Sequence, residues 1–254
     1  MPVFDLTGRT AFVTGASRGI GQVIAVALAQ AGADVAVAAR SEDGLRQTAA
    51  QISALGRKAL VLPLGVTRQE DVNAAVSRAI EQLGQVDVVV NNAGGSNFIV
   101  PFLDMRISGW EKVLRLNVDS AVYVCQAVGG HMRERGTGSV INVASVAGLS
   151  AAPGLVPYGA AKAAVISLTK TLAVEWAASN IRVNALCPGW TATDLNRNLW
   201  DTPDGGAATI ATVPMRRWAR ADEMAGPAVF LASDASSFMT GQVLIVDGGQ
   251  LANA

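Results

Sequence analysis

The stretch TAFVTGASRGIGQVIAVALAQ, residues 10–30, decides the fold of this chain. Its first five residues are apolar or β-branched, which predicts a strand buried on both faces. Gly15, Gly19 and Gly21 follow at once, and an alanine-rich helical segment starts among them. Glycine allows a sharp turn and lets a pyrophosphate approach the free N–H groups of a helix N-terminus. The order of strand, glycine turn and helix therefore predicts a dinucleotide-binding turn, with a simple packing turn as the alternative.

The rest of the chain repeats the pattern of strand and then helix. Six further β-rich runs lie at residues 34–39, 58–64, 86–91, 139–144, 181–187 and 242–246. Segments rich in Ala, Leu, Glu and Gln separate them, which predicts a parallel α/β sheet with right-handed crossovers and helices on both faces. No Pro/Ser-rich linker divides the chain, so we expect one doubly wound, Rossmann-type domain over residues 1–254. Residues 190–221 lack clear periodicity and are predicted to form a substrate lid.

The composition narrows the functional class. The chain has 254 residues, of which 50% are hydrophobic and 16% charged, and its formal net charge is zero. This suits a large buried core and does not favour nucleic acid or an anionic membrane as a partner. One histidine and two distant cysteines, Cys125 and Cys187, offer no metal site and indicate a reducing, cytoplasmic compartment. The apolar run at residues 23–39 is interrupted near its middle, so it predicts helix, turn and strand and not a membrane span.

The end of the second predicted strand bears on the choice of cofactor. An NAD site usually has an acidic residue there, which binds the ribose hydroxyls. Here Ala38 and Ala39 end the strand and Arg40 follows. A guanidinium can bind a 2′-phosphate through two parallel hydrogen bonds, and Arg18 in the glycine turn is placed to act with Arg40. We therefore expect NADP(H) to be preferred over NAD(H), the alternative being that both arginines are ordinary surface charges.

A second pattern occurs in VPYGAAKAAV, residues 156–165, where Tyr158 and Lys162 lie four positions apart. On a helix this spacing places both side chains on one face, about one turn apart. A free phenol has a pKa of about 10, too high for a base near neutrality, but a neighbouring ammonium favours the phenolate. Taken alone, the pair is better explained as an ordinary amphipathic contact on an alanine-rich helix.

Further motifs change that interpretation. In chain order the sequence contains TGASRGIG (14–21), NNAG (91–94), Asn117, Ser145 with YGAAK (158–162), PGWTATD (188–194) and TGQVLIVDGG (240–249). With these motifs the chain resembles the classical short-chain dehydrogenases/reductases over nearly its whole length. The resemblance implies a seven-stranded parallel sheet, a nicotinamide cofactor and hydride transfer to or from a small-molecule carbonyl or secondary alcohol. It also implies assembly into a homotetramer or homodimer.

The resemblance assigns roles to individual residues. Tyr158 is the expected catalytic acid–base, and Lys162 is expected to lower its pKa and to bind the nicotinamide ribose. Ser145 is expected to stabilise charge on the substrate oxygen, and Asn117 to hold a water that connects Lys162 to solvent. The residues expected to contact the cofactor are Gly15, Ser17, Arg18, Gly19, Ile20, Gly21, Arg40, Gly65, Val66, Asn92, Ala93, Gly94, Tyr158, Lys162, Pro188, Gly189, Thr191 and Thr193.

One position departs from the family pattern. After the third strand the family often has Asp or Asn, which touches the adenine, and here Gly65 precedes Val66. Because glycine has no side chain, any contact with adenine at this point is expected from the backbone or from apolar packing.

The sequence leaves the substrate open. The chain resembles 3-oxoacyl-thioester reductases and also sugar and polyol dehydrogenases of the same family. A regulator that binds a dinucleotide without catalysis is a further alternative, which the retained tyrosine and lysine disfavour. Trp190, Trp200 and Trp218 fall in the predicted lid, where they either wall an apolar substrate site or pack the lid. Arg133 and Arg135 are either solvated or contact an acidic carrier protein.

Overall fold

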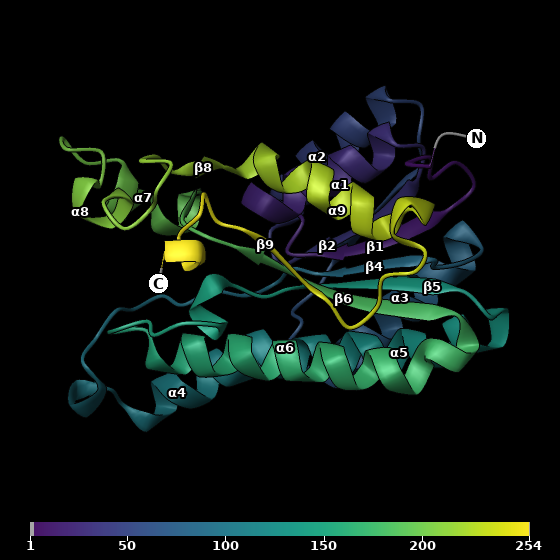
Figure 1. Ribbon diagram of the computed structural model, residues 1–254. Helices are drawn as coiled ribbons and strands as arrows, with labels where there is room; N and C mark the ends of the chain where they lie inside the picture. Colours follow the sequence, from purple (N-terminus) through teal and green to yellow (C-terminus); the bar gives the residue numbers. More distant parts are fainter. Residues whose placement is uncertain (1–2, 254) are drawn as a thin grey trace.

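The computed structural model describes residues 3–253 and is built around one parallel sheet (Figure 1). Seven strands hydrogen-bond in the order β3-β2-β1-β4-β5-β6-β9, each pair in parallel. They are β1 (Thr10–Thr14), β2 (Asp34–Ala39), β3 (Ala59–Pro63), β4 (Val88–Asn91), β5 (Gly138–Val143), β6 (Ile181–Pro188) and β9 (Val243–Val246). Each strand lies within two residues of a predicted run, and the predicted doubly wound parallel α/β fold is confirmed.

Alternate residues of a central strand face two different cores. In β1, Ala11 and Val13 join the core on one face of the sheet, whereas Phe12 joins the core on the other. All five residues of β1 and all four residues of β4 are buried. Burial on both faces explains why these runs are apolar throughout instead of alternating between apolar and polar residues.

Two layers of helices cover the sheet (Figure 1). One layer contains α1 (Gly19–Gln30), α2 (Glu42–Ala54) and α9 (Ala225–Ala232). The other contains α3 (Gln69–Leu83), α5 (Ser120–Arg135) and α6 (Val156–Trp176), with the shorter α4 (Ile107–Leu114) packed against α6. Among residues 3–253, no helix combines the length and apolar character needed to cross a bilayer.

Residues 190–221 form short elements despite their lack of periodicity. β7 (Thr191–Ala192) pairs in parallel with β8 (Ala219–Arg220), and α7 (Arg197–Trp200) and α8 (Ala207–Ile210) lie between them. The rings of Trp190 and Trp218 pack edge to face with centroids 5.5 Å apart. Trp218 Nε1 donates to Gly205 O at 2.9 Å, and Trp200 Nε1 donates to Thr193 O at 2.9 Å. Of the two interpretations of these tryptophans, packing within the segment is the one that the structure supports.

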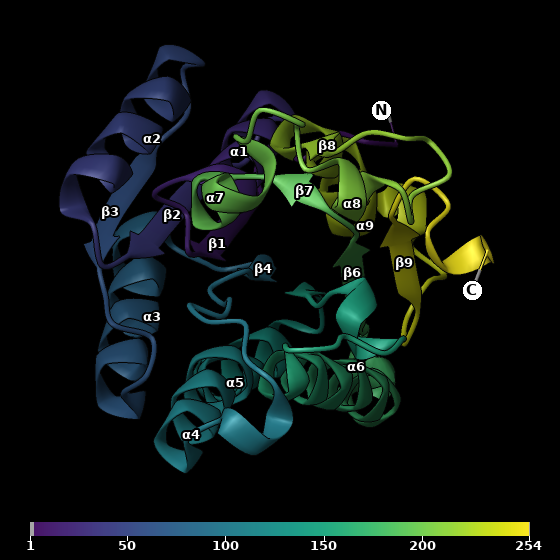
Figure 2. The same cartoon turned by 90° about the vertical axis from the view of Figure 1, so that its left-hand side faces the viewer.

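The strand order creates a switch point between β1 and β4. The chain runs from β1 outward to β2 and β3 and then returns to β4 on the other side of β1. The loops after β1 and β4 therefore leave in opposite directions at the carboxyl ends, which is where ligands bind in open α/β sheets. Figure 2 views this carboxyl edge, with α7 and β7 on one side and α4, α5 and α6 on the other.

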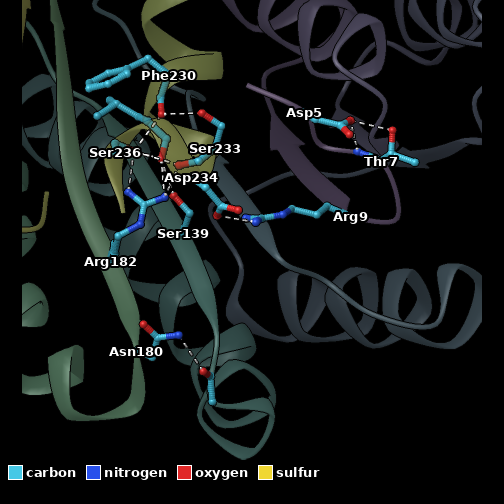
Figure 3. Close-up of polar contacts among 12 residues, drawn as sticks. Asp5, Thr7, Arg9, Ser139, Asn180, Arg182, Phe230, Ser233, Asp234 and Ser236 are labelled. Carbon is cyan, nitrogen blue, oxygen red and sulfur yellow. Dashed lines mark hydrogen bonds and ion pairs between the residues drawn. The ribbon is translucent and has the colours of Figure 1, made fainter. Parts of the chain in front are cut away.

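The opposite, amino edge of the sheet holds a partly buried guanidinium (Figure 3). Arg182, near the start of β6, points toward the C-terminal end of α9. It donates to Ser236 Oγ at 2.8 Å, to Leu231 O at 2.9 Å and to Ser233 O at 3.2 Å. Carbonyls at a helix C-terminus lack intrahelical partners and carry the negative end of the helix dipole, so Arg182 satisfies groups that folding leaves unpaired.

Candidate active site

The glycine turn after β1 has the backbone that its sequence predicts. Gly15 has φ +65° and Gly19 has φ +58°, a left-handed conformation that is costly for residues with a side chain. Arg18 precedes α1 in an extended conformation. Among the described residues, no side chain caps this end of α1, and its first turn contains no acidic residue. The N–H groups of the first turn are therefore available to an anion.

The loop after β4 packs directly against the glycine turn. Asn92 Nδ2 donates to Thr14 O at 3.0 Å and to Gly15 O at 3.2 Å, and Thr14 Oγ1 accepts from the N–H groups of Asn92 and Ala93. A Cβ at Gly15 would lie 2.6 Å from Asn92 Nδ2, and one at Gly21 would lie 2.3 Å from it. These two glycines therefore make room for Asn92, a packing requirement that adds to the one expected from a cofactor.

Two arginines lie beside the glycine turn without a partner. Arg40 directly follows β2, and the end of β2 is tied to the turn because Ala16 N donates to Ala38 O at 3.2 Å. Arg18 and Arg40 are both exposed, and neither forms an ion pair within residues 3–253. Two free guanidinium groups beside one loop are suited to bind a phosphate.

In the loop after β3, the space around residue 65 is empty. The classical family often has Asp or Asn at this position, and this chain has glycine. A Cβ built at Gly65 meets nothing within 4 Å, whereas Val66 is buried. Leu64 N donates to Ala39 O at 2.8 Å, so Gly65 lies beside the end of β2. There is room for a side chain at residue 65, and this chain leaves that room unfilled.

Asn117 lies in a π-helical turn, Arg115–Asp119, between α4 and α5. Its side chain is buried, with Nδ2 donating to Gly95 O and Val113 O at 2.9 Å each and Oδ1 accepting from Gly95 N at 2.9 Å. π-turns inside helices occur frequently at functional sites. Here the amide holds the loop after β4 in place at Gly95, and the expected role in a water relay stays a prediction.

Lys162 is buried directly against that loop. Its Nζ donates to Val143 O at 2.8 Å, and a Cβ at Gly94 would lie only 3.1 Å from Nζ and 2.6 Å from Asn117 Oδ1. Glycine at residue 94 therefore lets the loop approach both side chains closely. Burial lowers the pKa of Lys162 to about 8.

Tyr158 and Lys162 share one face of α6, as the spacing predicts, with Nζ 5.5 Å from the ring centroid. Burial raises the pKa of Tyr158 above its usual value, Cys187 adds to the increase and a hydrogen bond with Ser145 partly offsets it. Burial therefore outweighs the opposing contributions to the pKa of Tyr158, and the expected lowering of this pKa by Lys162 stays a prediction.

Cys187 is a neighbour of these groups that sequence reasoning missed. It is fully buried near the end of β6, where it hydrogen-bonds the backbone of Ser145 and interacts electrostatically with Lys162. Burial raises the pKa of the thiol to about 11, so the thiol is neutral near pH 7. Cys187 lies at the carboxyl end of a predicted strand, just before Pro188. This position is the sequence signal that could have placed Cys187 at the site, because ligands bind at the carboxyl ends of such strands.

Residues 190–221 reach over both loops of the switch point. A Cβ at Gly19 would lie 3.5 Å from Thr193 Cγ2, and one at Gly95 would lie 2.8 Å from Leu195 Cδ2. Asn196 fixes this part of the segment because its Oδ1 accepts from both N and Oγ1 of Thr193 at 3.0 Å. The segment therefore lies beside the same groups as the glycine turn and the loop after β4.

The other positions predicted to contact a cofactor have structural contacts of their own. Ile20 packs against the core of α1 and α2, and Ser17 contacts Gly44 at the start of α2. Pro188 ends β6, and a Cβ at Gly189 would lie 2.7 Å from Asp247 Cα. Thr191 is buried, and its hydroxyl donates to Gly189 O at 3.1 Å.

Comparison with known proteins identifies relatives that match nearly the whole chain. A family model described as enoyl-(acyl carrier protein) reductase matches residues 15–250. A gluconate 5-dehydrogenase from Gluconobacter oxydans is 38% identical, covering 97% of this chain and 96% of the relative. A 3-oxoacyl-[acyl-carrier-protein] reductase from a Synechocystis species is also 38% identical, covering 97% of this chain and 98% of the relative.

Solved structures agree with these relatives. A putative short-chain alcohol dehydrogenase from Sinorhizobium meliloti is 43% identical and superposes with a TM-score of 0.94, covering 99% of each chain. A gluconate 5-dehydrogenase from Burkholderia cenocepacia, solved in complex with NADP and tartrate, is 38% identical with a TM-score of 0.93, covering 98% of each chain. Together with the sheet order and the site geometry, these matches show that the chain is an oxidoreductase and belongs to the short-chain dehydrogenase/reductase family.

Proposed function

We propose that this oxidoreductase transfers a hydride between NADP(H) and a carbonyl or secondary alcohol, with Tyr158 as the acid–base. One observation carries the proposal: Lys162 lies beside Gly94 after β4, its Nζ is 5.5 Å from the ring of Tyr158, and Tyr158 hydrogen-bonds with Ser145. The four catalytic roles expected from the sequence, those of Ser145, Tyr158, Lys162 and Asn117, are therefore proposed together.

The chain's own groups at this edge fit NADP(H). The N–H groups at the start of α1 have no cap among the described residues, and Arg18 and Arg40 have no ionic partner there, which suits a pyrophosphate and a 2′-phosphate. A relative whose structure contains NADP supports the same cofactor. The bound cofactor supplies or accepts the hydride, and the residues that the sequence predicts as cofactor contacts are proposed to hold it.

The expected proton transfers follow from the shifted pKa values of Tyr158 and Lys162. The raised pKa of Tyr158 keeps the phenol protonated near neutrality, so Tyr158 can donate its proton to the substrate oxygen during reduction. Ser145, which hydrogen-bonds Tyr158, is placed to donate to the same oxygen. With a pKa of about 8, Lys162 is mostly an ammonium at pH 7 and can return a proton to Tyr158 through the water that Asn117 is proposed to hold.

Two substrate classes fit this chemistry. One is a 3-oxoacyl thioester or related ketone, and the other is a sugar or polyol. The names of the relatives support both, because they include a 3-oxoacyl-[acyl-carrier-protein] reductase and gluconate 5-dehydrogenases. Contact with an acidic carrier is less well supported, since Arg135 is paired with Asp87 at 2.8 Å and leaves Arg133 alone.

We also propose that residues 190–221 act as a substrate lid within one domain that spans the chain. The contacts of Thr193 with Gly19 and of Leu195 with Gly95 support a lid over the two loops. Gly206→Ala, whose Cβ would lie 2.4 Å from Leu199 O, should displace the segment between α7 and α8 and change kcat and KM together. Unchanged kinetics would contradict a lid that opens and closes.

The proposal also covers the oligomeric state of the protein and the cellular compartment in which it acts. The exposed apolar side chains of Val174 and Phe238 support a homotetramer or homodimer, which light scattering of the purified protein measures directly. The free, buried thiols of Cys125 and Cys187 support a reducing, cytoplasmic setting. Cell fractionation of the native host tests the compartment, and recovery outside the cytoplasm would contradict it.

The test of the function is NADPH consumption with acetoacetyl-CoA and, separately, with 5-keto-D-gluconate. Tyr158→Phe should lower kcat/KM by about 10²- to 10⁴-fold, because it removes the proton donor and little else. Tyr123→Phe is the matched control, since Tyr123 is the only other tyrosine and packs on α5 away from the site. Turnover that survives in Tyr158→Phe at the rate of the control would overturn the proposal.

A further inference from the structure

Three chain segments that carry or adjoin the proposed catalytic groups contain no charged residue. They are residues 88–103, which include β4 and the loop after it, residues 136–161 around Ser145 and Tyr158, and residues 183–193 at the end of β6. Over the whole chain 16% of residues are charged. Apart from Lys162, the surroundings of the reacting groups are therefore built from uncharged side chains.

Exposed apolar side chains project from these segments and from the lid. Ile99, Leu149 and Leu195, here called the apolar rim, are 57%, 42% and 47% exposed. Ile99 Cγ2 would lie 2.7 Å from a Cβ at Gly154, close before Tyr158, and Leu195 lies against Gly95. Leu149 directly follows the short turn that Ser145 caps. The rim residues therefore adjoin the loop after β4, the turn that follows Ser145 and the segment just before Tyr158.

Three polar side chains near the rim bond within the chain, while the amide of Asn97 beside them is exposed. Ser96 Oγ donates to Phe98 O at 2.8 Å, and Ser150 Oγ donates to Val146 O at 3.1 Å. The amide of Asn196 also bonds within the lid. A polyol needs several hydrogen-bonding partners to replace the water it loses on binding, and three of these four groups are already engaged.

Cations near the rim are also engaged. Arg197, two residues after Leu195, pairs with Asp194 at 2.6 Å and lies over the ring of Trp200. Farther along the lid, Arg216 donates to Ala211 O, and its neighbour Arg217 pairs with Glu223. The carboxylate of a sugar acid at Arg197 or Arg217 would compete with the carboxylate already paired there.

We infer that the apolar rim selects ketones or secondary alcohols flanked by an uncharged aliphatic chain, and that it discriminates against sugar acids. The inference rests on the proposed function and chooses between its two substrate classes. Aliphatic carbons bound against Ile99, Leu149 and Leu195 lose contact with water, whereas a carboxylate or a row of hydroxyls there would lose water without gaining partners.

The test compares kcat/KM over a series of 3-oxoacyl N-acetylcysteamine thioesters of increasing acyl length with kcat/KM for 5-keto-D-gluconate. Each methylene that the rim covers should raise kcat/KM, by up to about fourfold when it is fully buried. The sugar acid should be at least about 100-fold poorer than the longest thioester, as expected for an uncompensated carboxylate. A flat series, or a preference for the sugar acid, would overturn the inference.

A rim variant adds a second readout. Leu195→Asp should flatten the dependence of kcat/KM on chain length, and Leu195→Met, which conserves volume, should retain that dependence. Leu55→Asp is the matched control because Leu55 is a leucine of similar exposure, 42%, that follows the end of α2. Leu195→Asp retaining the full dependence on chain length would show that the rim does not contact the substrate.

Failure of the inference can be told from failure of the proposed function by including Tyr158→Phe throughout. A flat series that still depends on Tyr158 contradicts only the substrate selection. Rates that do not depend on Tyr158 contradict the proposed function, and the inference with it.

Discussion

Two cations, the partly buried Arg182 and the buried Lys162, lie near opposite edges of the same sheet and form different sets of hydrogen bonds. Arg182, at the amino edge, donates to four acceptors around the C-terminal end of α9 (Figure 3). Lys162, at the carboxyl edge, has one hydrogen bond among the described residues, to Val143 O. Burial lowers the pKa of both groups, but Arg182 stays charged because the pKa of a free guanidinium is above about 12.

The difference separates a structural role from a chemical one. A guanidinium whose two terminal nitrogens donate to groups of the fold stabilises that fold. An ammonium with donors to spare, held beside Gly94 and Tyr158, is available to a bound molecule but costs stability because it is buried with few partners. The other arginines follow the same division: Arg9 and Arg135 are paired at the amino edge, while Arg18 and Arg40 are free at the carboxyl edge.

The sharpest test of this contrast is Arg182→Met. It removes the charged donor to the carbonyls of Leu231 and Ser233 and leaves them the hydroxyl groups of Ser139 and Ser236, so the free energy of unfolding should fall by about 3 kcal/mol, independently of pH. Urea denaturation measures the loss. The activity of the folded fraction should not change, and a loss of stability below about 1 kcal/mol would contradict the structural role assigned to Arg182.

The corresponding change at the carboxyl edge is Lys162→Met. Its effect on the free energy of unfolding should depend on pH. The pKa of Lys162 is about 8 in the folded protein, and a free lysine side chain has a pKa of 10.5. Between pH 8 and 10.5 the unfolded chain therefore binds one proton at Lys162 that the folded protein has lost. The wild type should therefore gain about 2 to 3 kcal/mol of stability relative to Lys162→Met as pH rises from 7 to 10.

Urea denaturation of both proteins across this pH range checks the prediction. The thiols of Cys125 and Cys187 and the phenol of Tyr158 titrate in the opposite sense, but they are present in both proteins and largely cancel in the difference. A difference that stays constant with pH would mean that Lys162 is not held at a lowered pKa.

The smallest expected effect concerns the two exposed arginines of the carboxyl edge. Replacing Arg18 and Arg40 by alanine should weaken NADPH binding by about tenfold or more and leave NADH binding unchanged, because only NADPH carries a 2′-phosphate. Arg46→Ala is the control, since Arg46 is exposed on neighbouring α2 but already paired with Glu42. Isothermal titration with both cofactors measures the change, and an equal loss for NADH would mean that the arginines do not bind the 2′-phosphate.

Much of the fold and part of the site could be predicted from local sequence. A strand buried on both faces needs apolar residues throughout, so Ala11, Phe12 and Val13 are recognisable without any partner. Tyr158 and Lys162 could be paired because helix geometry fixes which residues share a face. Residues 190–221 were harder, because the pairing of β7 with β8 joins positions far apart in sequence and leaves no local periodicity.

The sequence by itself determined the order of strands and helices, the glycine turn and the spacing of Tyr158 and Lys162, since each depends on backbone preference or helix period. Only the tertiary structure decided in which direction the pKa values of Tyr158, Lys162 and Cys187 shift. Burial raises the pKa of Tyr158, Lys162 donates to Val143 O, and Cys187 lies beside both. It also revealed that Gly15 and Gly21 make room for Asn92. These properties depend on desolvation and on contacts between distant segments, which come into existence only when the sheet has assembled.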